Sequence, residues 1–261
     1  MSYPSILEWP LKAWLSSPCP PHKSVIVRGW SSSQQEASSP SIEGFSADYP
    51  KVVTVVVNEK NIGLGLALNK GLGFCRNELV ARMDTDDISL PGRCERQLDE
   101  FAKNSDLALV GSNVDEFIGS PDNIVSTRRV PSDYADIYEF AKRRSAFNHP
   151  AVMYKKSSVL SVGGYSDLRR NQDVDLFGRM LYSGLKAMNI DESLLLFRSG
   201  DSLAKRRRSW ANTSSYIEVI KKFWKMGYSS FVDFALVAAA QSFMFLCPNC
   251  VQHLLYKTFL R

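Results

Sequence analysis

The sequence predicts an α/β fold in which a mixed, mainly parallel sheet is flanked by helices and followed by a C-terminal helical extension. Three observations predict this architecture. From Lys51 onward, strand-like and helix-like segments alternate; residues 52–57 form a continuous β-branched run; and residues 206–261 carry long helical patterns. Regular alternation is typical of strands that are joined by crossover helices.

The first elements follow from local composition. Residues 52–57 are rich in valine and suit a strand that is buried on both faces, as parallel sheets require. The elements predicted after it are a turn at 61–65, a helix opening at 66–71, a short buried strand at 79–83, a helix from Pro91 to about Lys103 and a strand at 107–110.

The second half continues the alternation less regularly. Residues 113–147 are expected to be loops. They are followed by a strand at 151–154, a short helix at 156–162 that ends at two glycines, and a helix at 171–182 with apolar residues at helical spacing. Asp173 then lies at a helix N-terminus, where the helix dipole favours the charged carboxylate.

Three carboxylates, Asp84, Asp86 and Asp87, follow the apolar run 79–83 within four positions. Open α/β sheets place ligand sites at this kind of strand end. Such close negative charges repel one another unless a cation lies between them, and carboxylate oxygens suit Mg²⁺ or Mn²⁺. A solvated acidic turn with Asp87 as a helix cap is an equally good explanation of these residues alone.

Composition narrows the class of protein. The chain has 261 residues, is 44% apolar and carries a net charge of +5, which suits one sizeable globular domain with an appendage. Much of the basic excess lies in residues 205–208, so nucleic acid is not the expected partner. Five irregularly spaced cysteines and the lack of a leading apolar segment favour a reduced, cytoplasmic setting.

The apolar pattern at 231–246 is short for a membrane span and is interrupted by Asp233 and Gln241. Basic residues lie on both sides of it. Two placements are therefore open for the segment 206–261: packing against the main domain, or peripheral contact with the inner face of the cytoplasmic membrane.

Several motifs in unbroken order carry a resemblance to a known family. They are Asn61-x-Gly63-x-Gly65-x-Ala67-x-Asn69-x-Gly71, Ala81-Arg-Met-Asp-Thr-Asp-Asp-Ile-Ser-x-Pro91-x-Arg93-x-x-x-Gln97, Asn148-His-Pro, Gly163-Gly-Tyr165 and Gln172-Asp173-x-Asp175-Leu. Over roughly residues 50–260 the chain resembles family 2 glycosyltransferases, in particular bacterial enzymes that build capsule, O-antigen and exopolysaccharide.

The resemblance implies a GT-A fold, a nucleotide-sugar donor, in particular a UDP-sugar, and a glycan or lipid-linked acceptor. It also implies a divalent metal and inversion at the anomeric carbon. A metal held by Asp84 and Asp86, with Asp87 assisting, would neutralise the departing phosphate. Asp173 matches the family's base, which takes the proton of the acceptor hydroxyl. Gln172 stands where the family usually has Glu, which removes one upward influence on the pKa of Asp173.

Other positions are assigned by the same resemblance. Asn61, Gly63, Asn69 and Arg82 fall beside the nucleotide, and His149 falls near the metal or the acceptor. Arg206 and Arg207 match a basic segment near the donor phosphates, a role that suits guanidinium. A plain turn, a structural histidine and a solvated basic patch explain most of these residues equally well.

The first fifty residues depart from the family. Members end their second strand in an acidic Asp-Gly that grips the uridine, whereas residues 25–27 are followed here by Arg28-Gly29. We expect residues 1–50 to be an atypical, truncated or scrambled half-site, the result of a shifted reading frame over 10–40. Residues 51–205 are then the catalytic domain and 206–261 the helical extension.

Two other functional classes remain open at this stage. The first is a catalytically silent relative that acts as a binding or scaffold subunit, suggested by Arg28 and Gln172. The second is a glycoside hydrolase that uses two carboxylates, which fits less well because acids at a strand end within a βαβ pattern favour phosphate chemistry.

Overall fold

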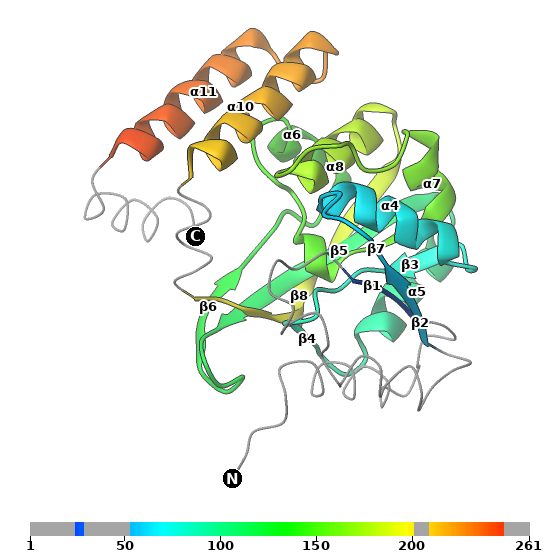
Figure 1. The fold of residues 1–261 in the computed structure, drawn as a ribbon. Coiled ribbons are helices and arrows are strands. Elements are labelled where there is room, and N and C mark those ends of the chain that lie inside the picture. Colours follow the sequence, from blue (N-terminus) through cyan, green and yellow to red (C-terminus); the bar gives the residue numbers. More distant parts are fainter. Residues whose placement is uncertain (1–23, 29–52, 201–208, 248–261) are drawn as a thin grey trace.

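The computed structural model describes residues 24–28, 53–200 and 209–247. A six-stranded sheet with strand order β3-β7-β5-β8-β4, to which β6 is added through β5, forms the centre of the molecule (Figure 1). Its strands are β3 (Leu79–Ala81), β4 (Ile88–Ser89), β5 (Leu107–Phe117), β6 (Ile124–Arg128), β7 (Met153–Lys155) and β8 (Lys186–Arg198). A separate parallel pair is made by β1 (Ser24–Arg28) and β2 (Val53–Val57).

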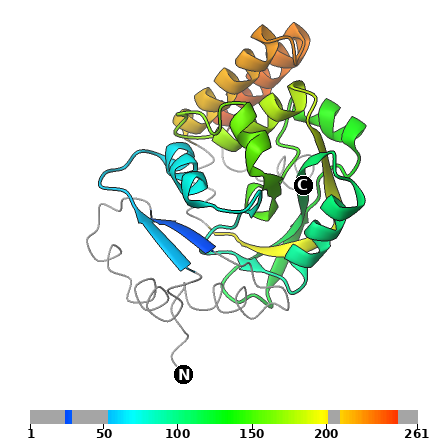
Figure 2. The same cartoon turned by 90° about the vertical axis from the view of Figure 1, so that its right-hand side faces the viewer.

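Helices cover both faces of the sheet (Figures 1 and 2). One face packs against α5 (Arg93–Lys103) through a small apolar cluster that includes Phe101 and Val110. The other face packs against a larger cluster that includes Leu109, Phe177 and Phe223. Its helices are α4 (Leu64–Phe74), α6 (Tyr134–Ala141), α7 (Lys156–Ser161), α8 (Gln172–Tyr182) and α10 (Trp210–Lys225).

Strand β5 shows why the sheet is buried on both sides. Its residues divide between the two clusters, with Leu107 and Val110 on the α5 side and Ala108 and Leu109 on the other, and a register shift falls between Leu107 and Leu109. Because successive side chains of a strand point to opposite faces, a continuous apolar run is needed for a central strand. The predicted strand at 107–110 is confirmed and extends to Phe117.

The prediction that the sheet is mixed is confirmed, but the expectation of a mainly parallel sheet is wrong for the described pairings. Only β1–β2 and β5–β8 are parallel, and the pairs made by β3, β4, β6 and β7 are antiparallel. Strand β7 follows α6 and a one-turn 3-10 helix, η1 (His149–Ala151), and runs antiparallel to both of its neighbours.

Three local predictions need correction. Residues 113–147 are not loop throughout, because they contain the end of β5, β6 and α6. Strand β2 is not buried on both faces, since Val53 and Val56 are buried while Val57 is 55% exposed. The short strand β3 is only half-buried, at the edge of its sheet.

The C-terminal helices α10 and α11 (Phe231–Leu246) form an antiparallel hairpin at one end of the molecule (Figure 1). A capping box at Ser230 and Asp233 starts α11. Among the described residues, no helix has both the length and the hydropathy that a membrane crossing requires.

Candidate active site

The acidic loop between β3 and β4 gathers its three carboxylates as the sequence predicted. Asp84, Asp86 and Asp87 each offer an oxygen, and these oxygens lie within 4.8 Å of one another. Strand β4 pairs with β8, so the loop is closed against the end of β8, where the Arg198 backbone N–H donates to Asp87 Oδ1 at 2.9 Å. The loop therefore leads into a short strand before α5 begins at Arg93, and not directly into a helix as expected.

Asp87 is fully buried, and its Oδ2 has no hydrogen-bond partner among the described residues. Burial raises the pKa of Asp87 to about 8, and the charges of Asp84 and Asp86 add to this rise. A buried carboxylate oxygen without a donor calls for a cation or a proton as its partner. The three acids thus fit a hard divalent cation such as Mg²⁺ or Mn²⁺.

Arg82 is the link between this loop and the rest of the site. Its buried guanidinium donates to both carboxylate oxygens of Asp84, at 2.9 and 2.5 Å. The same positive charge acts on the pKa of Asp87, His149 and Asp173. Predicted site residues from three segments, the acidic loop, η1 and α8, are therefore within electrostatic reach of one arginine side chain, which was expected to bind the donor.

Asp173 lies in the first turn of α8, as predicted. Burial raises the pKa of its carboxyl, whereas the backbone N–H groups of Asp173 and Val174 and the charges of Arg82 and Arg128 lower it. The N–H groups are free at a helix N-terminus, so the chain itself supplies donors that hold the carboxylate. The side chain of Asp173 retains partial solvent access, which a proton acceptor needs.

Gln172 and Asp175 flank Asp173 and are both buried. The carboxylate of Asp175 accepts from Arg179 at 2.9 Å and from Lys222 of α10 at 2.5 Å. This pair of cations ties α8 to α10, so Asp175 holds the element that carries Asp173.

His149 and Asn69 have structural partners. The His149 Nε2 lies 2.9 Å from the Tyr165 hydroxyl, and burial holds the pKa of His149 well below its usual range, so the ring is neutral. Asn69 donates to the Tyr165 carbonyl at 2.7 Å and accepts from the Tyr165 N–H at 2.8 Å. Both polar ends of Asn69 are therefore used to fix the loop beside Asp173.

Asn61 and Gly63 start α4. Asn61 Oδ1 accepts from the Gly63 N–H at 3.0 Å and from Arg169 at 3.1 Å, and Gly63 has a φ of 83° that favours glycine. The side chain of Asn61 is exposed, so it remains accessible to a ligand. Arg206 and Arg207, together with most of residues 1–50, lie outside the described residues.

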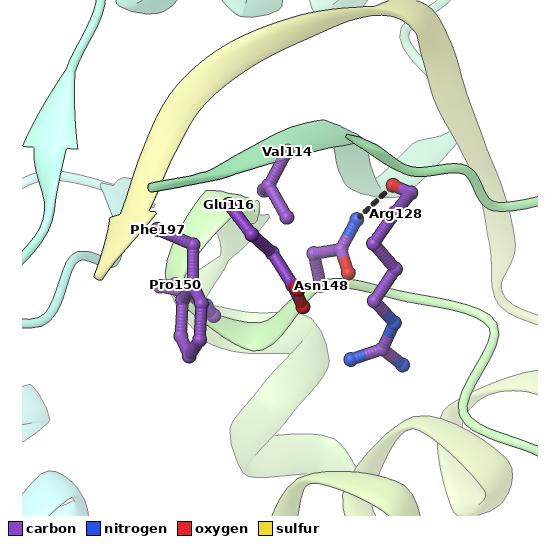
Figure 3. Close-up of a pocket in the computed structure, with 6 residues that line it drawn as sticks. All are labelled: Val114, Glu116, Arg128, Asn148, Pro150 and Phe197. Carbon is purple, nitrogen blue, oxygen red and sulfur yellow. Dashed lines mark hydrogen bonds between the residues drawn. The ribbon is translucent and has the colours of Figure 1, made fainter. Parts of the chain in front are cut away.

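A pocket opens between the end of the sheet and η1 (Figure 3). Its walls combine apolar surfaces from Pro150 and Phe197 with the polar side chains of Glu116, Arg128 and Asn148. Asn148 donates to the Ser112 and Arg128 carbonyl oxygens at 2.9 and 3.3 Å, but its buried Oδ1 accepts from no protein donor. This oxygen is suited to accept from a ligand hydroxyl.

Two residues of the pocket wall relate it to the predicted site. Phe197 precedes Arg198, whose backbone N–H donates to Asp87 Oδ1. The charge of Arg128 lowers the pKa of Asp173. The acids of the loop and Asp173 do not themselves line the pocket.

Sequence reasoning missed Arg198. Its side chain donates to the Asp86 carbonyl at 3.0 Å and stacks over the Phe117 ring with 4.6 Å between guanidinium and ring centroid. The available signal was an arginine directly after the apolar run 194–197. That signal is weak, because it becomes meaningful only when the β4–β8 pairing is known.

Comparisons with known proteins agree with this arrangement. A sequence model described as glycosyl transferase family 2 matches residues 32–168. The chain is 37% identical over 203 residues to the UDP-Gal:alpha-D-GlcNAc-diphosphoundecaprenol beta-1,3-galactosyltransferase of Escherichia coli, which covers 78% of this chain and 74% of that protein. It is 32% identical to the amylovoran biosynthesis glycosyltransferase AmsE of Erwinia amylovora, covering 78% of this chain and 76% of that protein.

Two solved structures share the fold at low sequence identity. The mannosyltransferase PcManGT from Pyrobaculum calidifontis, in complex with GDP-Man and Mn²⁺, matches with a TM-score of 0.63 at 14% identity over 93% of this chain and 66% of that chain. GalNAc-T7 with UDP, GalNAc and Mn²⁺ matches with a TM-score of 0.60 at 12% identity, over 90% of this chain and 48% of that chain. The expected GT-A fold is confirmed.

Proposed function

Because the chain belongs to glycosyl transferase family 2, we propose that it moves a sugar from a nucleotide-sugar donor to a glycan or lipid-linked acceptor with inversion at the anomeric carbon. The observation that carries the proposal is the cluster of three carboxylates in the acidic loop, together with the charge of Arg82, which pairs with Asp84 and also acts on Asp173. Transfer from a nucleoside diphosphate needs a place for the leaving phosphate and a base on the opposite side of the reacting carbon.

Asp84, Asp86 and Asp87 are the residues that would hold Mn²⁺ or Mg²⁺. When bound, the ion supplies positive charge against the diphosphate. The buried Oδ2 of Asp87 and the exposed carboxylate of Asp86 supply hard oxygen ligands of different mobility. Arg82 holds Asp84 in one orientation, because its fork geometry matches both carboxylate oxygens.

Asp173 accepts the proton of the attacking acceptor hydroxyl. The N-terminal N–H groups of α8 keep its carboxylate charged, while burial makes it more basic than an exposed aspartate. Gln172 leaves this chemistry available, since burial alone is the leading cause of the raised pKa. The side chains of Glu116 and Asn148 are placed to accept hydrogen bonds from sugar hydroxyls in the pocket.

The proposed classes of donor and acceptor are based on the activities that the names of two relatives state. The galactosyltransferase named above uses UDP-Gal and a diphosphoundecaprenol acceptor, and AmsE acts in amylovoran biosynthesis. We propose a UDP-sugar donor and a role in surface polysaccharide biosynthesis at the inner face of the cytoplasmic membrane. Residues 51–205 are proposed as the catalytic domain and 206–261 as a helical extension.

The test is nucleotide release from a panel of nucleotide sugars with and without Mn²⁺. We expect metal-dependent UDP release that falls by roughly a hundredfold or more in Asp86→Ala and in Asp173→Asn, in line with the loss of a metal ligand or a general base. Asp99→Ala, which removes an exposed carboxylate on α5, is the matched control. Full activity in both site variants would contradict the proposal.

A second candidate is a silent relative that binds but does not transfer, favoured by Gln172 and by Arg28-Gly29 at the end of β1. Calorimetry with UDP separates the two functions. A silent relative would show no affinity that depends on Mn²⁺, whereas the transferase requires it.

A further inference from the structure

The outward face of α11 is apolar along the whole helix. Five large apolar side chains on it, Phe231, Val232, Leu236, Phe243 and Leu246, are between 55% and 78% exposed. Exposed alanines lie between them, and together they cover about half of the helix circumference at 100° per residue. Single exposed apolar residues are ordinary, but a continuous face of this kind marks an interaction surface.

The one acidic residue of α11, Asp233, is buried, accepts hydrogen bonds from Ser230 and forms an ion pair with Arg143. One polar residue, the half-buried Ser242, falls on the apolar face at 100° per residue. Val237 is buried on the same side, toward the rest of the molecule. Within the described part of the chain nothing covers the opposite, apolar side.

Cations and tryptophans border this face. Arg143, whose side chain is 56% exposed, reaches the start of α11 through Asp233. Trp224 stacks on Phe234 with 5.4 Å between ring centroids and contacts Phe231 at 5.3 Å. Lys221 and Lys225 are exposed on either side of Trp224 on α10.

A second tryptophan lies against α11 at the other end of the hairpin. Trp210, 56% exposed, contacts Phe245 at 5.1 Å. The face therefore has an aromatic residue with a polar ring nitrogen near each end. Tryptophan is favoured at membrane–water interfaces for this reason, and flanking Lys and Arg side chains are attracted to anionic lipid headgroups.

We propose that α11 and its border dock in the headgroup layer of an anionic bilayer, with the helix axis parallel to the membrane plane. Sixteen residues give α11 a length of about 24 Å, less than the roughly 30 Å of a hydrocarbon core. An apolar half-cylinder with cations at its edge is the pattern of interfacial helices. The inference does not depend on the proposed transferase activity.

Docking would also orient the active site. Lys222 of α10 binds Asp175 of α8, the helix that carries Asp173. The hairpin is therefore anchored to the same helix as the candidate base. A membrane-bound hairpin fixes the height of Asp173 above the bilayer.

The test is cosedimentation of the full 261-residue chain with vesicles of phosphatidylglycerol and phosphatidylcholine, and with vesicles of phosphatidylcholine alone. We expect binding to the anionic vesicles that weakens as salt is added. Leu236→Glu should weaken it by roughly tenfold or more, because a charge replaces a side chain that is buried on docking. Leu160→Glu on α7 is the control, since Leu160 is 53% exposed against 55% for Leu236.

A double variant, Lys221→Gln with Lys225→Gln, should lose affinity for anionic vesicles and change little with neutral ones. Circular dichroism of each variant checks that the hairpin folds. The proposal is overturned if the wild type stays in the supernatant with both vesicle types, or if Leu236→Glu binds as tightly as the wild type. It is also overturned if Leu236→Glu instead dissociates a dimer, which would make the face a contact between copies.

Discussion

Asp173 is subject to opposing influences on its pKa. Burial raises the pKa of the carboxyl and is the largest cause, while helix N–H groups and the charges of Arg82 and Arg128 lower it. A base works only as the carboxylate, so activity should fall as pH decreases through this raised pKa. We expect the acidic limb of the pH–rate profile to lie above the ordinary aspartate value of 3.8.

Gln172→Glu tests this assignment at the neighbouring position. A second carboxylate beside Asp173 disfavours its charged form, so the acidic limb should move to higher pH. The measurement is the difference between the profiles of wild type and variant with saturating Mn²⁺, which cancels contributions from the acidic loop. An unchanged limb in a folded variant would show that Asp173 does not set the profile.

The residue types at the site were predictable to different degrees. Asp84, Asp86 and Asp87 are adjacent in sequence, so their grouping follows from local geometry alone. The pairing of Arg82 with Asp84 is also local, because the two residues are two positions apart. The contacts of Asn69 with Tyr165 join segments far apart in the chain, and no local pattern identifies that partner. The resemblance assigned the Asn69 side chain to the nucleotide. In the structure this side chain is hydrogen-bonded to the backbone of Tyr165.

At the scale of elements, the start of α4 is packed tightly against the loop that leads to α8. A Cβ on Gly65 would lie 2.6 Å from the Ser166 carbonyl oxygen, a backbone atom that cannot rotate away. It would also contact the side chains of Tyr165 and Gln172. The absence of a side chain at Gly65 thus sets the distance between α4 and the candidate base.

Gly65→Ala should therefore destabilise the fold by about 1–3 kcal/mol, as overpacking of a close contact does. Gly73→Ala on the same helix is the matched control, because a Cβ there meets nothing within 4 Å. Alanine is the better helix former, so the control should be stabilised by about 0.5–1 kcal/mol. Urea unfolding of both variants measures the difference; equal effects would show that the contact is not tight in solution.

Helices were easier to predict than strand directions. The helix at 171–182 and the pattern at 231–246 correspond closely to α8 and α11, since amphipathic periodicity and caps are local signals. Strand β7 also appears where expected, but nothing in its local sequence gives its antiparallel direction. Strand pairing is not visible in composition.

At the scale of the whole molecule, β5, β6, β8 and η1 contribute the walls of the pocket, and the Lys222–Asp175 ion pair connects the hairpin to α8 (Figures 1 and 3). The GT-A fold followed from the order of motifs along the chain, because each motif lies at an element boundary. The position of the hairpin could not be predicted from the order of motifs, because it depends on the Asp175–Lys222 and Asp233–Arg143 ion pairs between distant elements.

The whole molecule also decides whether the atypical end of β1 still permits donor binding. A ligand that binds only the folded state stabilises it by about 2.7 kcal/mol at a hundred times its dissociation constant. For a chain of this size that corresponds to a rise in Tm of roughly 5–10 °C. We expect UDP with Mn²⁺ to raise the Tm of the wild type by this order, and Mn²⁺ or UDP alone to raise it less.

Asp86→Ala should lose the joint effect, whereas Asp99→Ala should keep it, because only the first removes an oxygen of the acidic cluster. A measurement with GDP and Mn²⁺ in place of UDP and Mn²⁺ reports whether the site distinguishes guanine from uracil. If UDP with Mn²⁺ still raised the Tm of Asp86→Ala, the metal would bind at another place. No shift in any nucleotide would mean that Arg28-Gly29 at the end of β1, where the family has an acid, has removed donor binding and would favour the silent relative.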